Sequence, residues 1–294
     1  MKDLFFNWPI NTIEIDDENY PSSLKKIKKP PIKLFYRGNF DKNIFEKCIA
    51  VVGSRKNTKY GQSVLETLVP KLVNQKITIV SGFMFGIDSL AHLSCIEYGG
   101  KTIAVLGNGL NVIYPSSNNK LYSQILDSGG LIMSEYESDF KPVLWSFPQR
   151  NRIVAGLSNL GILVIEAGEK SGSLITARIG MEERRKIYCV PGPINSNVSF
   201  GTNQLIKEGL AKMVTTVEDI IEGQKDKHSQ MNLFSQLSTE EKNIVGQLCR
   251  EPMSADELSK SLKIEISSLL TRLSMMEMQG IIEEQGGKYY LTIR

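Results

Sequence analysis

The chain has 294 residues, 41% of them hydrophobic, and a net charge of +3, a composition typical of a globular protein with one large core and a smaller second domain. No apolar run approaches bilayer length, and the first residues lack the pattern of a cleaved signal peptide, so we expect a cytoplasmic protein without a membrane span. With two histidines and no CxxC spacing, the sequence indicates no metal site. No cofactor is expected either. Its cysteines are expected to be buried, reduced thiols: Cys48, Cys95, Cys189 and Cys249.

The charge is unevenly distributed along the chain. Residues 235–294 contain seven Lys/Arg and nine Asp/Glu, so the other 234 residues carry +5. The positive balance therefore belongs to the larger, first part, which favours an anionic ligand there.

Residues 1–45 are expected to form an N-terminal extension that packs on the core. Lys33–Gly38 has the pattern of a strand. The basic stretch 24–29 is either a solvated helix or turn, which we favour, or a nucleic-acid contact.

From residue 46 to residue 222, short apolar runs alternate with stretches of helical periodicity, which predicts a doubly wound, mostly parallel α/β sheet. The expected strands are Ile49–Val52, Ile77–Val80, Thr102–Leu106, Leu131–Ser134, Ile162–Ile165, Ile187–Val190 and Lys212–Val214. The expected helices are 62–73, 88–98, 117–128, 150–158, 173–185, 202–209 and 216–222, the first of them kinked or split at Pro70.

The stretch 48–88 contains the chemistry around which this domain is organised. Gly53–Lys56 follows the first strand, and Ser81–Gly82 and Gly86–Asp88 follow the second. Glycine allows the main chain to approach a ligand closely, and free N–H groups at a helix start attract anions. The pattern predicts a phosphate-binding crevice at the carboxyl ends of the strands, although tight βα turns alone would also need glycines.

Several common enzyme motifs are absent. The chain has no GxxxxGK[ST], GxGxxG or GxSxG, which removes most support for ATP hydrolysis, ordinary dinucleotide binding and α/β-hydrolase chemistry. His92 is expected to be a packed or helix-capping residue rather than a catalytic imidazole.

The segment Asp139–Arg152 is broken by prolines and is expected to be largely loop. It interleaves Lys141, Arg150 and Arg152 with three aromatic residues, a pattern suited to single-stranded nucleic acid. The alternative is that Trp145 and Phe147 seal the edge of the sheet. Two further strand-to-helix anion loops are expected at 166–173 and 192–203.

A polar stretch at 222–230 predicts a linker, which we place at 223–234. Residues 235–294 then show three helical stretches (239–249, 254–261 and 265–279) and two short strands around Gly286–Gly287, the pattern of a winged helix. The recognition helix has one cation, Arg272, and two glutamates. This favours a protein contact over reading of a DNA groove.

Seven motifs in order resemble the DNA processing protein A family (DprA, also called Smf): VVGSRK, SGFMFGID, IAVLGNGLNVIYP, FPQRNRIVAGLS, VIEAGEKSGSLITAR, VPGPI and GTNQLI. The resemblance implies an extended Rossmann-like core followed by a winged-helix domain. It also implies single-stranded DNA binding, a homodimer through the core, protection of incoming DNA in natural transformation, loading of the RecA recombinase, and no enzymatic activity.

The same resemblance implies which residues contact DNA. They are Gly53, Ser54, Arg55 and Lys56 in the first turn, Ser81, Gly82, Gly86, Ile87 and Asp88 in the second, Phe147, Arg150, Asn151 and Arg152 for stacking and phosphate contacts, and Ser171, Gly172 and Ser173 in the same pocket. Met84 and Phe85 are bulkier than the small residues that the family usually has at this place.

Two other functions stay open. The sheet and its glycine loops resemble nucleotide phosphoribohydrolases, in which Arg178 and Glu182 would face an N-glycosidic bond, but PGGxGTxxE is absent. A DNA-binding regulator acting through the winged helix is the second alternative, and the acidic balance of residues 235–294 disfavours it.

Overall fold

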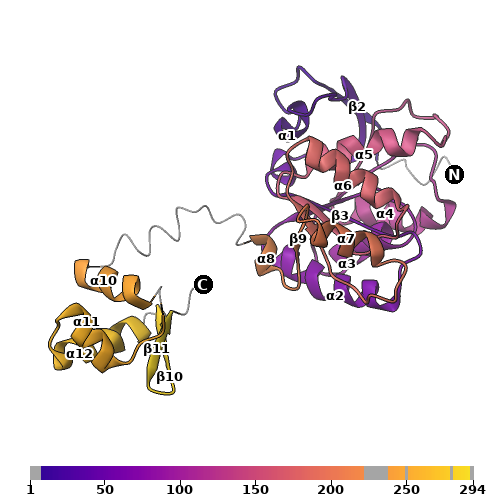
Figure 1. Ribbon diagram of the computed structural model, residues 1–294. Helices are drawn as coiled ribbons and strands as arrows, with labels where there is room; N and C mark the ends of the chain where they lie inside the picture. The colour runs from indigo at the N-terminus through magenta and orange to yellow at the C-terminus, as the bar shows by residue number, and fades with distance from the viewer. Residues whose placement is uncertain (1–7, 222–237, 249–250, 279–280, 292–294) are drawn as a thin grey trace. The chain divides into compact units, whose positions relative to one another are not determined.

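The computed structural model describes residues 8–221, 238–248, 251–278 and 281–291 (Figure 1). The chain divides into two compact units, 1–224 and 225–294, which are considered separately. The linker expected at 223–234, and Cys249, lie outside the described residues.

The large unit contains a nine-stranded sheet in the order β1-β2-β6-β5-β4-β3-β7-β8-β9. The seven strands β3 to β9 run parallel, whereas β2 pairs antiparallel with both β1 and β6. The bounds are β1 Asn11–Glu14, β2 Lys33–Gly38, β3 Cys48–Val52, β4 Thr78–Ser81, β5 Thr102–Val105, β6 Leu131–Ser134, β7 Gly161–Val164, β8 Ile187–Cys189 and β9 Lys212–Met213. The expected doubly wound, mostly parallel sheet is confirmed.

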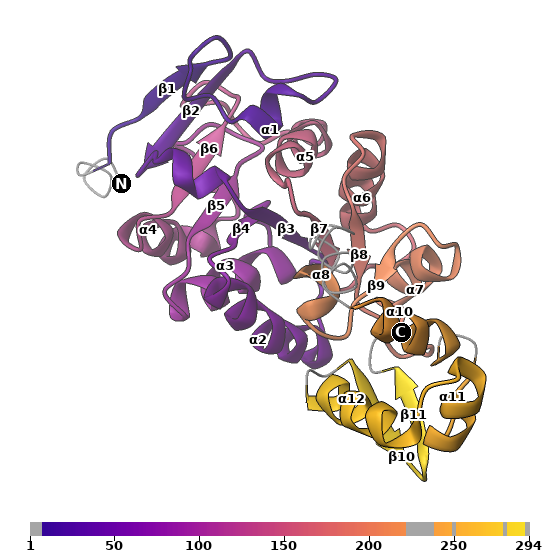
Figure 2. The same cartoon turned by 90° about the vertical axis from the view of Figure 1, so that its left-hand side faces the viewer.

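Strand β3 shows why the sheet is covered on both faces. Cys48, Ala50 and Val52 pack into one core and Ile49 and Val51 into another, because successive side chains of a strand point to opposite faces. Figure 2 shows α1, α5 and α6 on one side of the strands and α2, α3 and α4 on the other. The bounds are α1 Ser22–Lys25, α2 Lys59–Asn74, α3 Ile87–Glu97, α4 Asn119–Asp127, α5 Ser146–Leu157, α6 Gly172–Glu182, α7 Phe200–Lys207 and α8 Glu218–Ile221, with 3-10 turns at Lys42–Phe45 and Ser116–Asn118.

The structure differs from the sequence-based prediction at three places. Of the two outcomes expected at Pro70, a kink or a split, the split does not occur, and α2 continues through Pro70. Leu65, Leu68 and Leu72 are buried in one core, and this packing outweighs the lost backbone hydrogen bond. Strand β1 was not expected, since Ile13 is its single buried residue. Helix α5 begins at Ser146, so the end of the expected loop 139–152 is helical.

Residues 8–45 do more than pack on the core, because β1 and β2 extend the sheet itself. The short helix α1 ends at Lys25, and Leu24 and Ile27 of the basic stretch are buried. A Cβ on Gly156 of α5 would lie 2.6 Å from the Leu24 side chain, so this stretch packs tightly on α5.

The small unit is the expected winged helix. Helices α10 (Thr239–Leu248), α11 (Ala255–Leu262) and α12 (Ile266–Met278) surround one apolar core with the hairpin β10 (Ile282–Gln285) and β11 (Lys288–Leu291). Ser254 and Glu257 form a capping box at the start of α11. Gly286 and Gly287 have φ of 61° and 79°, which a two-residue hairpin turn requires.

Within these described ranges, no helix combines the length and the apolar character needed to cross a membrane.

Candidate functional site

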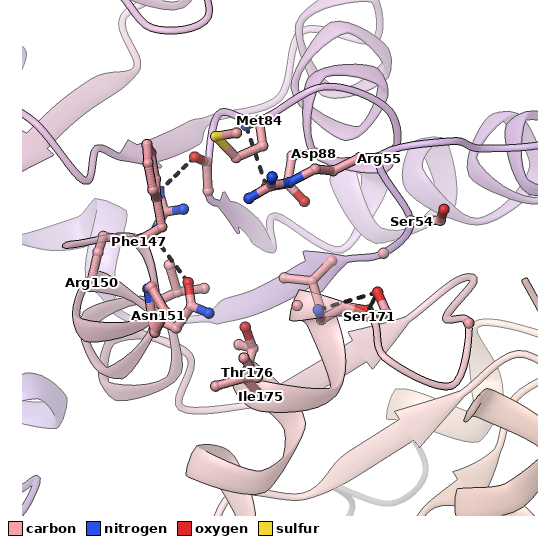
Figure 3. A pocket seen from close by; sticks show the side chains of 18 of the residues that line it. Ser54, Arg55, Met84, Asp88, Phe147, Arg150, Asn151, Ser171, Ile175 and Thr176 are labelled. Carbon is pink, nitrogen blue, oxygen red and sulfur yellow. Dashed lines mark hydrogen bonds between the residues drawn. The ribbon is translucent and has the colours of Figure 1, made fainter. Parts of the chain in front are cut away.

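The order of the strands creates a crevice beside β3. The chain moves from β3 outwards through β4, β5 and β6, and then returns to the other side of β3 as β7. At such a switch point the loops at the carboxyl ends of the two central strands part, which leaves room for a ligand. A cavity of about 540 Å³ lies there. Residues from four separate stretches surround it (Figure 3): 52–56, 82–88, 144–154 and 168–176, together with Tyr114 and Val198.

The first two glycine turns fit directly against each other. A Cβ on Gly53 would lie 2.6 Å from Cγ1 of Ile87, and a Cβ on Gly86 would lie 2.2 Å from the carbonyl oxygen of Ser54. Gly86 also has φ of 79°, a conformation that glycine tolerates best. Ile87 is fully buried and its N–H donates to the Ser54 carbonyl at 3.2 Å. Gly86 and Ile87 therefore shape the crevice from behind and do not line it.

A buried carboxylate holds the first turn in place. Glu166, 1% exposed, follows β7 and accepts hydrogen bonds from Thr58 N (3.0 Å) and Thr58 Oγ1 (2.5 Å). Thr58 is also the N-cap of α2. The sequence placed Glu166 in an anion loop but did not show this role, which depends on β3 and β7 being neighbours.

Arg150 of α5 is buried and connects the ends of two strands, β4 and β5. Its side chain is 3% exposed, and Nη1 donates to the carbonyl oxygens of Gly82 (2.5 Å) and Val105. Burial lowers its pKa to about 10, so the guanidinium is charged at neutral pH. The expectation that Arg150 supplies a phosphate contact stays a prediction, and the structure shows that part of its hydrogen-bonding capacity is used within the protein.

Asp88 lies beside this guanidinium at the base of the crevice. A Cβ on Gly82 would be 2.6 Å from Asp88 Oδ2 and 2.7 Å from Arg150 Nη2, so only glycine leaves both charged groups in place. Met84 N donates to Asp88 Oδ2 at 3.4 Å. Burial raises the pKa of Asp88 to about 6, and the charges of Arg150 and Arg55 oppose this shift.

The remaining expected cations have different surroundings. Arg55 and Lys56 are exposed at the crevice, and neither takes part in the two ion pairs found among the described residues. Arg152 instead pairs with Glu135 at 2.5 Å and is absent from the cavity lining. Asn151 lines the cavity and accepts from Arg150 Nε at 3.2 Å.

The start of α6 faces the cavity opposite the first turn (Figure 3). Ser171 is its N-cap and its Oγ is 2.8 Å from Ser173 Oγ. Ser171, Gly172 and Ser173 all line the cavity, and the N-terminus of an 11-residue helix favours an anion at this place. Ser81, in contrast, is buried with Oγ donating to the Val51 carbonyl at 2.7 Å, and it does not reach the cavity.

One wall of the crevice is apolar and partly aromatic. The rings of Phe147 and Tyr114 lie with centroids 5.6 Å apart, and both residues line the cavity. Met84 also lines it and is buried, whereas Phe85 is 46% exposed and outside the lining. Sequence reasoning did not select Tyr114, Leu144 or Ile175. The Tyr114–Pro115 loop after the third strand was the available signal for the first of them.

The side chains considered for catalysis do not meet in this cavity. His92 is fully buried with Nδ1 2.6 Å from Thr102 Oγ1, and burial lowers its pKa to about 3. Arg178 and Glu182 are exposed on α6, and neither lines the cavity. The arrangement considered for glycosidic cleavage is therefore not formed.

The expected anion loop 192–203 is closed by one side chain. Asn203 Oδ1 accepts from Gly192 N at 3.1 Å, and Asn203 Nδ2 donates to the Gly192 carbonyl oxygen at 2.9 Å.

Fold and site together define an α/β protein with a crevice at the switch point of its sheet, followed in the chain by a winged-helix domain. The family model described as DNA recombination-mediator protein A matches residues 11–225, and the DprA winged helix domain matches residues 234–288. The chain belongs to the DNA recombination-mediator protein A family, as its motifs indicated.

Individual relatives agree with this assignment. DNA processing protein DprA of Streptococcus pneumoniae is 44% identical over 210 residues, which cover 71% of this chain and 73% of the relative. The solved structure of DprA from that organism covers 75% of this chain and 76% of its own, at 42% identity and a TM-score of 0.68. A Helicobacter pylori DNA processing protein A structure, described as showing a unique single-stranded DNA binding mode, is 32% identical, with coverage of 74% and 97% and a TM-score of 0.66.

Proposed function

We propose that the crevice binds single-stranded DNA without cleaving it, and that the protein acts in DNA processing during natural transformation and recombination. The observation that carries this proposal is the composition of the crevice. Exposed Arg55 and Lys56 and the α6 N-terminus face the same space as the rings of Tyr114 and Phe147. Cations and amides suit phosphates, and rings suit unpaired bases. The Helicobacter pylori relative, described by its single-strand binding, supports the same ligand class.

The absence of bond-breaking chemistry is part of the proposal. Of the lining residues, Asp88 is the only carboxylate, and it is buried beside Arg150. Over the described ranges no group of three His, Cys, Asp or Glu side chains could hold a metal ion. These features favour binding over hydrolysis.

We extend the proposal to partners. The family resemblance suggests that the bound strand is protected and handed to RecA, and that two copies associate through the sheet domain. Strand β9 is one of the two edge strands of the sheet. Met213 within it is 50% exposed, and Leu210 just before it is 48% exposed. An exposed edge with apolar side chains is suited to pairing with a second copy.

The winged helix is proposed to contact protein. Arg272 of α12 forms an ion pair with Glu240 of α10 at 2.6 Å, so this cation is already partnered within the domain. Reading a DNA groove needs donors and cations presented to the bases.

A salt-titrated anisotropy assay with fluorescent oligothymidylate tests the central claim. We expect binding that weakens steeply with salt, weak duplex binding, and a salt slope lowered by about 0.7 in Arg55→Ala, the loss of one phosphate contact to a single strand. Normal binding by Arg55→Ala, with binding abolished by removal of residues 225–294, would overturn the crevice assignment. Release of a nucleobase from a nucleoside monophosphate would favour the enzyme instead.

A further inference from the structure

We propose that a bound single strand continues out of the crevice onto a second stacking surface, the aromatic platform formed by Tyr136, Phe140 and Trp145. This inference rests on the proposed function. It concerns the part of the DNA that lies outside the crevice, where a base would stack on Trp145.

The platform is a compact cluster of three rings. Tyr136 and Phe140 stack with centroids 4.5 Å apart and an interplanar angle of 14°. Trp145 meets both of them edge-on, with centroids 6.0 Å from each. Despite these contacts, Trp145 is 57% exposed. A large exposed ring that is packed against two others is suited to stacking with an unpaired base.

The platform is held in position by the backbone beneath it. Gly109 N donates to the Phe140 carbonyl at 2.9 Å, and Asn111 N donates to the Ser138 carbonyl at 2.8 Å. Asn111 Nδ2 also donates to Asp139 Oδ1 at 2.9 Å. A Cβ on Gly109 would lie 2.1 Å from the Glu137 carbonyl oxygen, so the two loops are in direct contact. The rings are therefore ordered before a ligand arrives, which lowers the entropy lost on binding.

The platform adjoins the crevice through one residue. Leu144 lines the cavity and is 91% exposed, and Trp145 follows it as the N-cap of α5. Phe147, two residues further, belongs to the aromatic wall of the crevice. A DNA strand that passes over Leu144 would therefore reach Trp145 next.

The charges around the platform indicate stacking rather than phosphate binding. Lys141 is exposed there, but so are Glu137 and Asp139. Because these charges do not favour an anion, the platform should add affinity that does not depend on salt. This separates it from the crevice, whose cations make binding salt-dependent.

The test compares oligothymidylates from about four to about twenty nucleotides, the range of site sizes seen for single-strand binding. We expect Trp145→Ala in the full chain to bind the shortest oligomers as the wild type does. It should bind the longer ones about tenfold more weakly, the effect of losing one base–aromatic stack, with an unchanged salt slope. Trp145→Phe should restore most of the loss. Tyr98→Ala is the matched control, since Tyr98 is an exposed aromatic residue (52%) at the C-terminus of α3.

Fluorescence gives a second measurement. The chain has two tryptophans, so Trp8→Phe leaves Trp145 as the single reporter. Long oligomers should quench it and the shortest should not. The platform would be overturned, with the crevice left intact, if Trp145→Ala bound long oligomers as the wild type does and if long oligomers did not quench Trp145 in Trp8→Phe. An equal loss for short and long oligomers would place Trp145 in the crevice itself, and an effect confined to self-association would make the platform a contact between copies. Failure of the wild type to bind any oligomer would instead overturn the proposed function.

Discussion

Replacing Arg150 with alanine should destabilise the large unit, because this buried side chain connects α5 to the ends of β4 and β5. Its guanidinium donates to the carbonyl oxygens of Gly82 and Val105. Hydrogen bonds from a charged donor contribute about 1.5–3 kcal/mol each, so losing both should lower the free energy of unfolding by about 3–6 kcal/mol. Since the charge of Arg150 lowers the pKa of Asp88, that carboxyl should take up a proton in the variant and add little further cost.

The assay is thermal unfolding followed by tryptophan fluorescence. Both tryptophans, Trp8 and Trp145, belong to the large unit, so the signal does not report on the winged helix. At about 2–4 °C per kcal/mol for a unit of this size, Tm should fall by about 6–24 °C. Arg55→Ala is the control: the side chain is exposed, so Tm should stay unchanged while DNA affinity falls.

The reverse pattern would refute the reasoning. If Arg150→Ala melts with the wild type and loses only DNA binding, the guanidinium acts directly on the ligand and its contacts with the two carbonyls are not what stabilises α5.

Three further predictions concern the groups around the crevice. Because burial raises the pKa of Asp88 to about 6, the carboxyl is neutral below that pH and charged above it, so DNA affinity should fall as pH rises from 5 to 7. Asp88→Asn should flatten this profile, whereas His92, whose pKa lies near 3, stays neutral throughout. The folded state also holds the Asp88 proton more tightly than the unfolded state, in which the pKa of this carboxyl is near 3.8. The free energy of unfolding, measured by denaturant titration, should therefore decrease as the pH rises from about 4 to about 6. Gly82→Ala places a methyl group 2.6 Å from Asp88 Oδ2. The overpacking should lower the free energy of unfolding by about 1–3 kcal/mol, measured by urea unfolding. Unchanged stability in this variant would show that the side chains at the base of the crevice move aside. Glu166→Ala removes the acceptors of two hydrogen bonds that Thr58 donates. At about 1.5–3 kcal/mol for each hydrogen bond to a charged group, stability should fall by about 3–6 kcal/mol, and DNA binding should weaken with it. Full DNA affinity in this variant would show that the first turn keeps its shape without the carboxylate.

Much of the candidate site could be predicted from the order of residues in the sequence. Apolar runs that end in glycine or serine placed Gly53, Gly82 and Ser171 just past parallel strands or at a helix start, and the carboxyl ends of such strands meet at one edge of a sheet. The structure brings these three residues around one cavity. Local periodicity was sufficient here because each turn needs only its own strand and helix to form.

The roles of the arginines could not be predicted in this way. Arg150 and Arg152 are two positions apart, yet one is buried against strand ends and the other pairs with Glu135. Similarly, Tyr114 joins the crevice wall only because its loop meets Phe147 of α5. Such outcomes depend on which distant element covers a side chain, so they arise from packing between segments far apart in the chain, whereas strand order and turn chemistry are encoded locally.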